Sequence, residues 1–317
     1  MSDFMDAFFT DHFVLPLPAG HRFPMEKYRM LREQVSHLSG LNLKEAPAAD
    51  DAALLLAHTP EYVGKVTNGT LTPAEVREIG FPWSPEMVER SRRSVGATLA
   101  ACASALRDGV SVNLAGGTHH AYRDKGSGYC VFNDAAIAAK WLQQQRGDSH
   151  RVAIIDLDVH QGNGTAAIIG QDPTVLTLSM HGEKNFPFRK EASQIDIGLP
   201  DGCQDDEYLS CLHRALREVH RAFAPEFILY LAGADAHEDD RLGRLKLTKP
   251  GMLARDEAVF DLAQALGVPI AVAMAGGYGH VVQTTVDVHA QTVRAALSSQ
   301  VARITGESSA RAQPHRG

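Results

Sequence analysis

The sequence has few cysteines, and none of them belongs to a short paired motif. The four among 317 residues are Cys102, Cys130, Cys203 and Cys211, and no two of them form a CxxC pair. This argues against a disulfide-stabilised scaffold, and no charged and then apolar leader precedes them. We therefore expect a protein of a reducing compartment, with the cytoplasm as its location.

Long apolar runs and an excess of positive charge are also absent. The longest hydrophobic stretches have the length of a β-strand, which is far too short to cross a membrane. Acidic residues outnumber basic ones, 38 to 31, for a net charge of −7. Because a protein that grips nucleic-acid phosphates usually presents a basic face, we expect neither a direct nucleic-acid partner nor a membrane partner. The oligomeric state is left open.

The sequence does have enough apolar residues for one large core. With 44% hydrophobic residues, it predicts a single domain over residues 1–305 and a disordered tail over 306–317. From Val112 onward, apolar strands alternate with helical segments, which predicts an α/β fold with a parallel sheet and helices on both faces. Residues 1–23 and 64–83 are expected to be irregular. Helices are predicted at residues 25–38, 84–108, 205–223 and 284–297.

Three apolar stretches run directly into polar side chains where each predicted strand ends. They are residues 112–120, 154–160 and 229–235. In a parallel sheet, side chains beyond the carboxyl ends of strands converge although they lie far apart in sequence. Asp158, His160 and Asp235 would then give a zinc ion two oxygen ligands and one nitrogen ligand, with one position open for water. Each residue alone fits an ordinary polar strand end, but together they predict a hydrolytic metal site.

Two histidines and a tyrosine complete the candidate site. His119 and His120 follow a Gly-Gly turn; adjacent loop histidines are more often exposed, yet the matching strand ends favour a catalytic pair. Imidazole changes charge near neutral pH, so it can take a proton from water and hand it to a leaving amine. Tyr278 lies in a glycine-rich turn after the predicted strand 269–275, and its hydroxyl would stabilise an oxyanion. That turn lacks GxGxxG and the lysine of a phosphate-binding loop.

These motifs, in this order, resemble the zinc-dependent histone deacetylase superfamily and, within it, the branch called class IV. The resemblance spans residues 58–289 and rests on the motifs Gly116 to Ala121, Gly128 to Asp134, Asp156 to Gly164, Ala232 to Asp235 with Asp240 to Gly243, and Ala275 to Gly279. It implies an arginase/deacetylase fold. It also implies hydrolytic removal of an acetyl or longer acyl group from an acylated lysine or a related amine.

The resemblance further implies a role for each residue of the site. The metal ligands would be Asp158, His160 and Asp235, and the catalytic residues His119, His120, Asp156, Asn163 and Tyr278. His120 is the expected general base, and Asp156 would orient His119. Asn163 stands where many relatives carry an aspartate. Since an amide stabilises an imidazolium less than a carboxylate does, we predict a less basic His120 than in those relatives.

A substrate tunnel and a potassium site follow from the same likeness. The tunnel residues would be Gly128, Tyr129, Phe186, Leu242 and Gly276; aromatic faces suit an alkyl stem, although composition alone would place them in the core. A structural K⁺ would be held by Asp156, Leu157, Asp158, His160, Ser179 and Met180. The catalytic metal is expected to be Zn²⁺, with Fe²⁺ as the alternative, because a site of oxygen and nitrogen ligands accepts both.

The sequence leaves three alternative functions open. Acetylpolyamines are also substrates in this superfamily, and residues 64–85, the expected rim of the tunnel, contain no aspartate to hold a peptide backbone. A ureohydrolase such as arginase needs two metal ions and additional bridging carboxylates, whereas Asn163 and Ala236-His237 follow the ligands here. A non-catalytic acyl-lysine binding module is disfavoured by the complete set of ligands, histidines and tyrosine.

Overall fold

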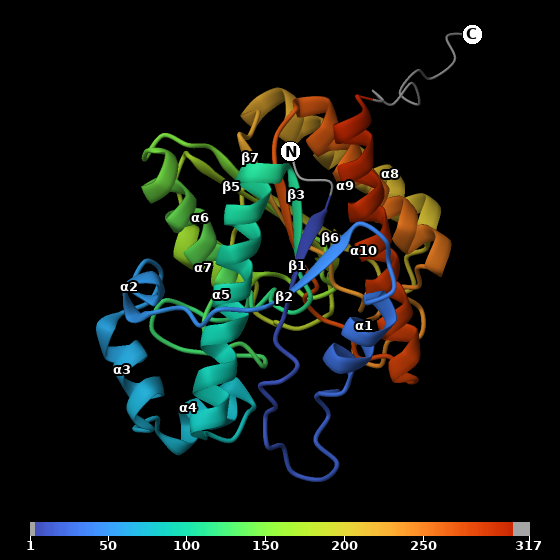
Figure 1. Cartoon of the computed structure of the whole chain (residues 1–317). Helices are drawn as coiled ribbons and strands as arrows, with labels where there is room; N and C mark the ends of the chain where they lie inside the picture. Colours follow the sequence, from blue (N-terminus) through green and yellow to red (C-terminus); the bar gives the residue numbers. More distant parts are fainter. Residues whose placement is uncertain (1–3, 307–317) are drawn as a thin grey trace, which may run out of the picture.

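A parallel sheet forms the centre of the molecule, which is described over residues 4–306 by a computed structural model (Figure 1). Its strands are β1 (Met5–Phe9), β2 (Leu41–Glu45), β3 (Val110–Asn113), β4 (Val152–Asp156), β5 (Val175–Gly182), β6 (Ile195–Leu199), β7 (Phe227–Leu231) and β8 (Ile270–Ala273). They form one eight-stranded sheet in the order β2-β1-β3-β8-β7-β4-β5-β6, and each neighbouring pair runs parallel. The predicted parallel α/β fold is therefore confirmed.

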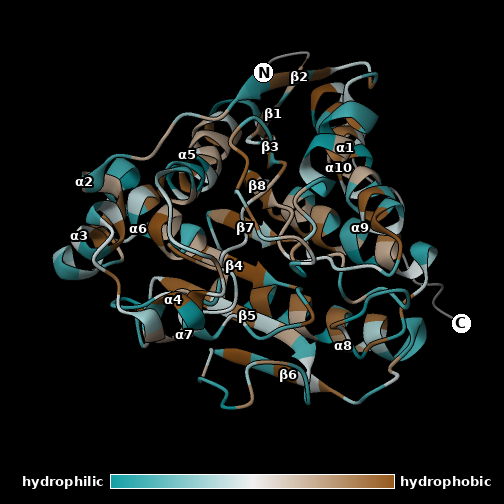
Figure 2. Ribbon diagram, turned by 90° about the horizontal axis from the view of Figure 1, so that it is seen from below, coloured by the Kyte–Doolittle hydropathy of each residue, from teal (hydrophilic) through white to brown (hydrophobic). Residues whose placement is uncertain are grey.

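Helices cover the sheet on both faces, as Figure 2 shows. One layer consists of α1 (Lys27–Val35), α8 (Asp205–Glu218), α9 (Lys249–Leu266) and α10 (Val282–Thr305), and the other of α2 (Asp51–Leu54), α3 (Pro60–Asn68), α4 (Pro73–Ile79), α5 (Pro85–Asp108), α6 (Asp134–Arg146) and α7 (Asn163–Ile169). Alternate strand residues serve the two layers: Ile155 packs with the first and Ile154 with the second. Because both faces are buried at the centre of the sheet, strands such as β4 and β7 read as continuous apolar runs.

The prediction that residues 1–23 are irregular is wrong at β1. Asp6 interrupts the apolar run of this strand, and the interruption hides the strand in the sequence. In the fold Asp6 is buried and accepts hydrogen bonds from Asn42 at 2.7 Å, Lys44 at 2.8 Å and Ser104 at 2.8 Å. A buried carboxylate is tolerated when it is paired and hydrogen-bonded in this way.

The prediction that residues 64–83 form a loop is also wrong, because helices α3 and α4 occupy most of this segment. Two of the glycines and one of the threonines that suggested a loop are helix caps. Gly69 and Gly80 end the two helices in the left-handed conformation, and Thr72 begins α4 with a capping box that includes Glu75. The rim of the cavity described below is therefore built partly by a helix end.

The other predicted helices are present with shifted ends. The segment 205–223 forms α8 and then one π-helical turn, η1 (Val219–Phe223), and the last helix extends eight residues beyond the predicted 297, to Thr305. Of the predicted tail, residues 307–317 lie outside the described part, and the single domain over 1–305 remains a prediction. Within residues 4–306, no helix is both long enough and apolar enough to cross a membrane.

Candidate metal centre and active site

Four loops meet beyond the carboxyl ends of four adjacent strands. The strands β3, β8, β7 and β4 are neighbours in the sheet, and each leads into one segment of the candidate site. These segments carry His119 and His120, Tyr278, Asp235, and the pair Asp158 and His160, respectively. Parallel strands place their carboxyl ends at one edge of a sheet, so residues more than 100 positions apart are brought together.

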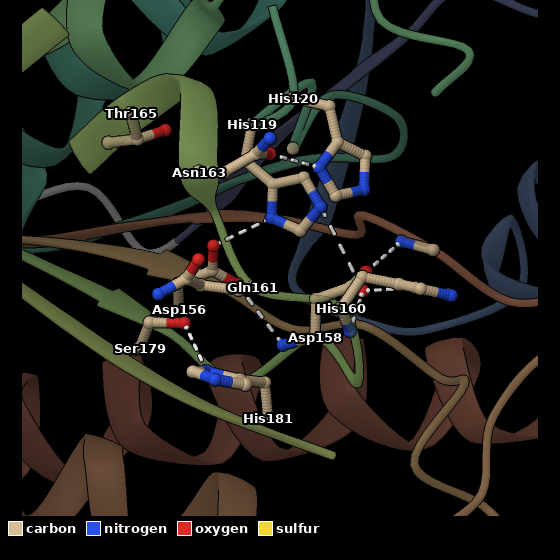
Figure 3. A network of polar contacts seen from close by, with 12 residues as sticks. His119, His120, Asp156, Asp158, His160, Gln161, Asn163, Thr165, Ser179 and His181 are labelled. Atoms are coloured by element: carbon tan, nitrogen blue, oxygen red, sulfur yellow. Dashed lines mark hydrogen bonds and ion pairs between the residues drawn. The ribbon is translucent and has the colours of Figure 1, made fainter. Parts of the chain in front are cut away.

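Asp158, His160 and Asp235 form a buried triad. One ligand atom from each lies within 4.8 Å of the others, and no second group of this kind is found among residues 4–306. The Nδ1 atom of His160 lies 3.0 Å from Asp158 Oδ1 and 3.3 Å from Asp235 Oδ2. The three residues predicted to bind the metal therefore point at one another (Figure 3 shows Asp158 and His160).

Two features of the triad suit a bound cation. Asp235 Oδ1 accepts a hydrogen bond from the Val159 backbone N–H at 2.9 Å, but Oδ2 is buried and makes no hydrogen bond; its contact with His160 Nδ1 at 3.3 Å is an ion pair only when the imidazole is protonated. Burial and the charge of Asp158 raise the pKa of the Asp235 carboxyl to about 7. A buried carboxylate oxygen without a hydrogen bond is costly, and a metal ion relieves that cost. The donor set of two carboxylates and an imidazole fits Zn²⁺ or Fe²⁺.

The space between the two carboxylates depends on Gly276. A Cβ atom at this position would lie 2.0 Å from Asp235 Oδ2 and 2.5 Å from Asp158 Oδ2, so it would fill the place where the ligand atoms converge. The Gly276 N–H also donates to Asp158 Oδ2 at 2.8 Å, which fixes this carboxylate. The glycine is thus required for space.

We expect Gly276→Ala to abolish stoichiometric metal binding, because the new methyl group displaces both carboxylates. Metal content per chain, measured by inductively coupled plasma mass spectrometry, reports this directly. Gly64→Ala is the matched control, since a Cβ there meets nothing within 4 Å. Gly64 lies inside α3, where alanine in place of glycine stabilises a helix by about 1 kcal/mol. An unchanged metal content in Gly276→Ala would contradict this account of the triad.

The two histidines are held by different partners (Figure 3). His119 Nδ1 lies 2.6 Å from Asp156 Oδ2, and His120 Nδ1 lies 2.7 Å from Asn163 Oδ1. Both rings are buried, with centroids 4.1 Å apart. Burial lowers the pKa of His119, but the charges of Asp156 and Asp158 outweigh it and raise the pKa to about 9. Burial and then the charge of His119 hold the pKa of His120 well below its usual range.

A hydrogen-bond chain fixes the tautomer of His120. Asn163 Nδ2 donates to Tyr122 Oη at 2.9 Å, and this hydroxyl donates to Glu191 Oε1 at 3.3 Å. The Asn163 amide nitrogen is therefore turned away from His120, and its carbonyl oxygen accepts from Nδ1–H. The Nε2 atom of His120 is left with its lone pair, as a proton acceptor must be.

The turn that carries Tyr278 is held from two sides. The Tyr278 N–H donates to Asp240 Oδ2 at 2.6 Å. The ammonium of Lys27 donates to the carbonyl oxygens of Ala275 at 3.4 Å and Gly277 at 3.3 Å, and it lies 5.4 Å from the centre of the Tyr278 ring. Burial raises the pKa of Tyr278 well above its usual value, so the hydroxyl keeps its proton and remains a hydrogen-bond donor.

A cavity of about 640 Å³ connects this site with the surface. His119, His120, Asp158, His160 and Tyr278 lie along it. The five residues predicted to form a tunnel, Gly128, Tyr129, Phe186, Leu242 and Gly276, line the same cavity. His120 contacts Phe186 edge-on, with ring centroids 4.9 Å apart, so the aromatic wall reaches the histidine pair.

This arrangement of sequence and geometry matches a known family. Residues 21–294 match the family described as the histone deacetylase domain. The chain belongs to the histone deacetylase family. The resemblance inferred from the motifs is thereby confirmed at the level of the superfamily, whereas the class IV branch stays a prediction.

Relatives support membership in the histone deacetylase family. An uncharacterized protein of Picosynechococcus is 43% identical over 90% of this chain and 95% of its own length. The histone deacetylase-like amidohydrolase of Pseudomonas aeruginosa is 31% identical over 83% of this chain and 74% of its own length. A crystal structure of an HDAC homolog complexed with SAHA has a TM-score of 0.80 at 21% identity, covering 100% of this chain and 96% of that one, which shows the shared fold.

Arg255 is a site residue that the sequence did not reveal. It is completely buried on α9 and donates to the carbonyl oxygen of Gly233 at 2.5 Å, next to the loops that carry the histone deacetylase motifs. Its own charge is compensated by Asp256 at 2.7 Å. Arg-Asp neighbours on a helix usually lie on a solvated face, so only the fold shows that this pair supports the loop before Asp235.

Two of the residues predicted to bind potassium, Asp156 and Ser179, lie on neighbouring strands. Ser179 of β5 pairs in register with Asp156 of β4, and Figure 3 shows the two side chains close together. The Ser179 hydroxyl contacts His181 Nδ1 at 2.9 Å. The potassium site itself remains a prediction.

Proposed function

We propose that this protein is a metal-dependent hydrolase that removes an acetyl or longer acyl group from an acylated lysine or a related amine. The observation that carries the proposal is the convergence of the triad Asp158, His160 and Asp235 with a histidine pair and a tyrosine; all of these residues except the buried Asp235 line one cavity. Metal ligands, a proton acceptor and an oxyanion donor are the three parts that amide hydrolysis needs.

Asp158, His160 and Asp235 would hold the metal, which we propose is Zn²⁺, with Fe²⁺ as the alternative. When bound, such an ion supplies Lewis-acid chemistry to the amide carbonyl and to water. The triad offers one such position, and a ureohydrolase would bind two ions. Metal analysis that finds two ions per chain would favour the ureohydrolase.

The remaining steps belong to the protein's own side chains. His120 Nε2 takes a proton from the water that attacks the carbonyl carbon, because its tautomer is set by Asn163. The Tyr278 hydroxyl donates a hydrogen bond to the oxyanion that forms. As the carbon–nitrogen bond breaks, the protonated histidine pair returns the proton to the nitrogen, and a carboxylate and a free amine leave. Asp156 orients His119 during these steps.

The alkyl stem of the acylated amine would lie between Tyr129 and Phe186. Both rings line the cavity, and Gly128 lies against His120 and Phe186: a Cβ at Gly128 would lie 2.7 Å from the His120 ring and 3.0 Å from Phe186. Leu242 and Gly276 complete this wall. A structural K⁺ would stabilise the loop that carries Asp158 and His160. Its ligands would be Asp156, Leu157, Asp158, His160, Ser179 and Met180.

A fluorogenic acetyl-lysine peptide tests the activity. We expect cleavage that a chelator abolishes and added Zn²⁺ restores. A metal-loaded protein that binds the peptide without cleaving it would instead be an acyl-lysine binding module. A panel with longer acyl groups then defines the acyl length that the cavity accepts.

Replacement of Asn163 by leucine should lower kcat by about ten- to a hundredfold, which is the usual cost of losing a hydrogen bond that orients an active-site imidazole. KM should change little, because Asn163 contacts His120 and Tyr122 and does not line the cavity. Asn163→Asp keeps an oxygen acceptor and should retain more activity than the leucine variant. Equal activity of Asn163→Leu and the wild type would remove Asn163 from the mechanism.

A further inference from the structure

The mouth of the cavity is positively charged, although the chain as a whole has a net charge of −7. Three exposed cations line the cavity: Arg77 near the end of α4, and Lys184 and Arg244 in two loops. These side chains come from three separate parts of the sequence. The fold therefore gathers cations around the entrance that the proposed substrate must pass.

Nearby acidic residues do not cancel this charge. Glu78, which also lines the cavity, is paired with Lys125 at 2.7 Å. Asp201 is shared by two cations, at 3.0 Å from Arg244 and 4.0 Å from Lys184. Within the described residues no ion pair is found for Arg77, so the group as a whole has two uncompensated positive charges.

The acidic neighbour of Lys184, Glu183, is not among the residues that line the cavity. Glu183 lies against β6, where a Cβ at Gly198 would meet the Glu183 Cβ at 3.4 Å. On the side of the mouth next to Lys184, an aromatic residue is exposed instead. Phe188 also lines the cavity, is 88% exposed and contacts the ring of Phe186 edge-on. The mouth thus combines cations with an exposed apolar surface.

We propose that this mouth selects acyl-lysine peptides with aspartate or glutamate beside the acylated lysine. Like charges repel and opposite charges attract across an exposed entrance, so a polycation such as an acetylated polyamine is disfavoured. Phe188 offers an apolar contact to the part of the peptide that stays outside the cavity. The inference rests on the proposed amide hydrolysis and specifies its substrate class.

Three acetyl-lysine peptides of equal length, flanked on both sides by glutamate, glutamine or lysine, test the proposal together with an acetylated polyamine. We expect kcat/KM to fall in the order glutamate, glutamine, lysine, by about tenfold from first to last, with the change mainly in KM, because several exposed charge pairs each contribute modestly. The acetylated polyamine should be a poor substrate. The preference should shrink in high salt, which screens exposed charges.

A triple variant assigns the preference to the mouth. Arg77→Gln combined with Lys184→Gln and Arg244→Gln should remove most of the difference between the peptides while cleavage of the glutamine peptide is retained. The matched control carries the same change in charge on the helical segment 205–223, at Arg214, Arg217 and Arg221, which are exposed and do not line the cavity. This control should keep the wild-type order.

The outcomes separate the two proposals. If the wild type cleaves all peptides equally well, or if the triple variant keeps the preference, the selective mouth is refuted and the hydrolase stands. If neither a peptide nor the acetylated polyamine is cleaved, the proposed function fails; if only the polyamine is cleaved, the hydrolase stands and the selective mouth is refuted. Fluorescence anisotropy with the same peptides then still tests the mouth, because binding needs no turnover: tighter binding of the glutamate peptide supports it and equal binding overturns it.

Discussion

Tyr278→Phe should lower kcat on an acetyl-lysine peptide by about a hundred- to a thousandfold, the usual cost of losing one oxyanion donor. The substitution keeps the ring that packs against Phe23 and Lys27, and the backbone hydrogen bond to Asp240 does not involve the hydroxyl. We therefore expect an unchanged melting temperature and an unchanged metal content. Steady-state kinetics together with a thermal melt measure both quantities.

Tyr129→Phe is the matched control for this prediction. Tyr129 lines the same cavity and lies 6.1 Å from the Tyr278 ring, centroid to centroid. The Tyr129→Phe variant also loses one hydroxyl, but Tyr129 is proposed only to line the cavity. The kcat of this variant should therefore stay within a few-fold of the wild-type value, as expected for a side chain without a role in the transition state. Loss of activity to the same extent in both variants would show that the tyrosine hydroxyls share a structural role.

Asp235→Asn should remove both metal binding and activity. The amide oxygen still accepts the hydrogen bond from the Val159 N–H, at 2.9 Å in the wild type, so the loop should fold. The uncharged side chain cannot compensate a cation beside Asp158. In the wild type, free Zn²⁺ at about a hundredfold above its Kd should stabilise the fold by about 2.7 kcal/mol, and the variant should show no such gain.

Thermal melts with and without Zn²⁺ and metal analysis test this prediction without an enzyme assay. Asp148→Asn, in an exposed turn after α6, provides the control because it makes the same chemical change away from the site. It should bind metal and respond to Zn²⁺ like the wild type. Full metal content in Asp235→Asn would exclude Asp235 as a ligand and with it the proposed triad.

Much of the site was predictable because its signals are local. A strand that is covered on both faces is apolar throughout, so Asp156, Asp158 and His160 mark the end of β4 in the sequence itself. The same holds for Asp235 after β7. The prediction of a loop over residues 64–83 failed because a glycine that ends a helix looks like a glycine of a loop. The helix start between the two glycines, marked by Thr72 and Glu75, is what distinguishes them.

Other features depend on partners that are distant in sequence. Asp6 reads as an interruption of a strand until Lys44 and Ser104 are seen to bind it. Arg255 reads as a surface residue until its guanidinium is found against the Gly233 carbonyl. In each case the sequence shows a charged side chain, and only the packing determines whether that side chain is buried, paired or solvated.

The sequence by itself determined the residue types of the site, the parallel α/β fold and the superfamily, because strand ends, turns and motif order are properties of short segments. The tertiary structure decided which atoms face one another. The order of strands β3, β8, β7 and β4 brings His120, Tyr278 and His160 to one cavity, and Tyr122 turns the Asn163 carbonyl toward His120. The charge of the mouth is also a tertiary property, because Arg77 and Arg244 become neighbours of one entrance only when the chain folds.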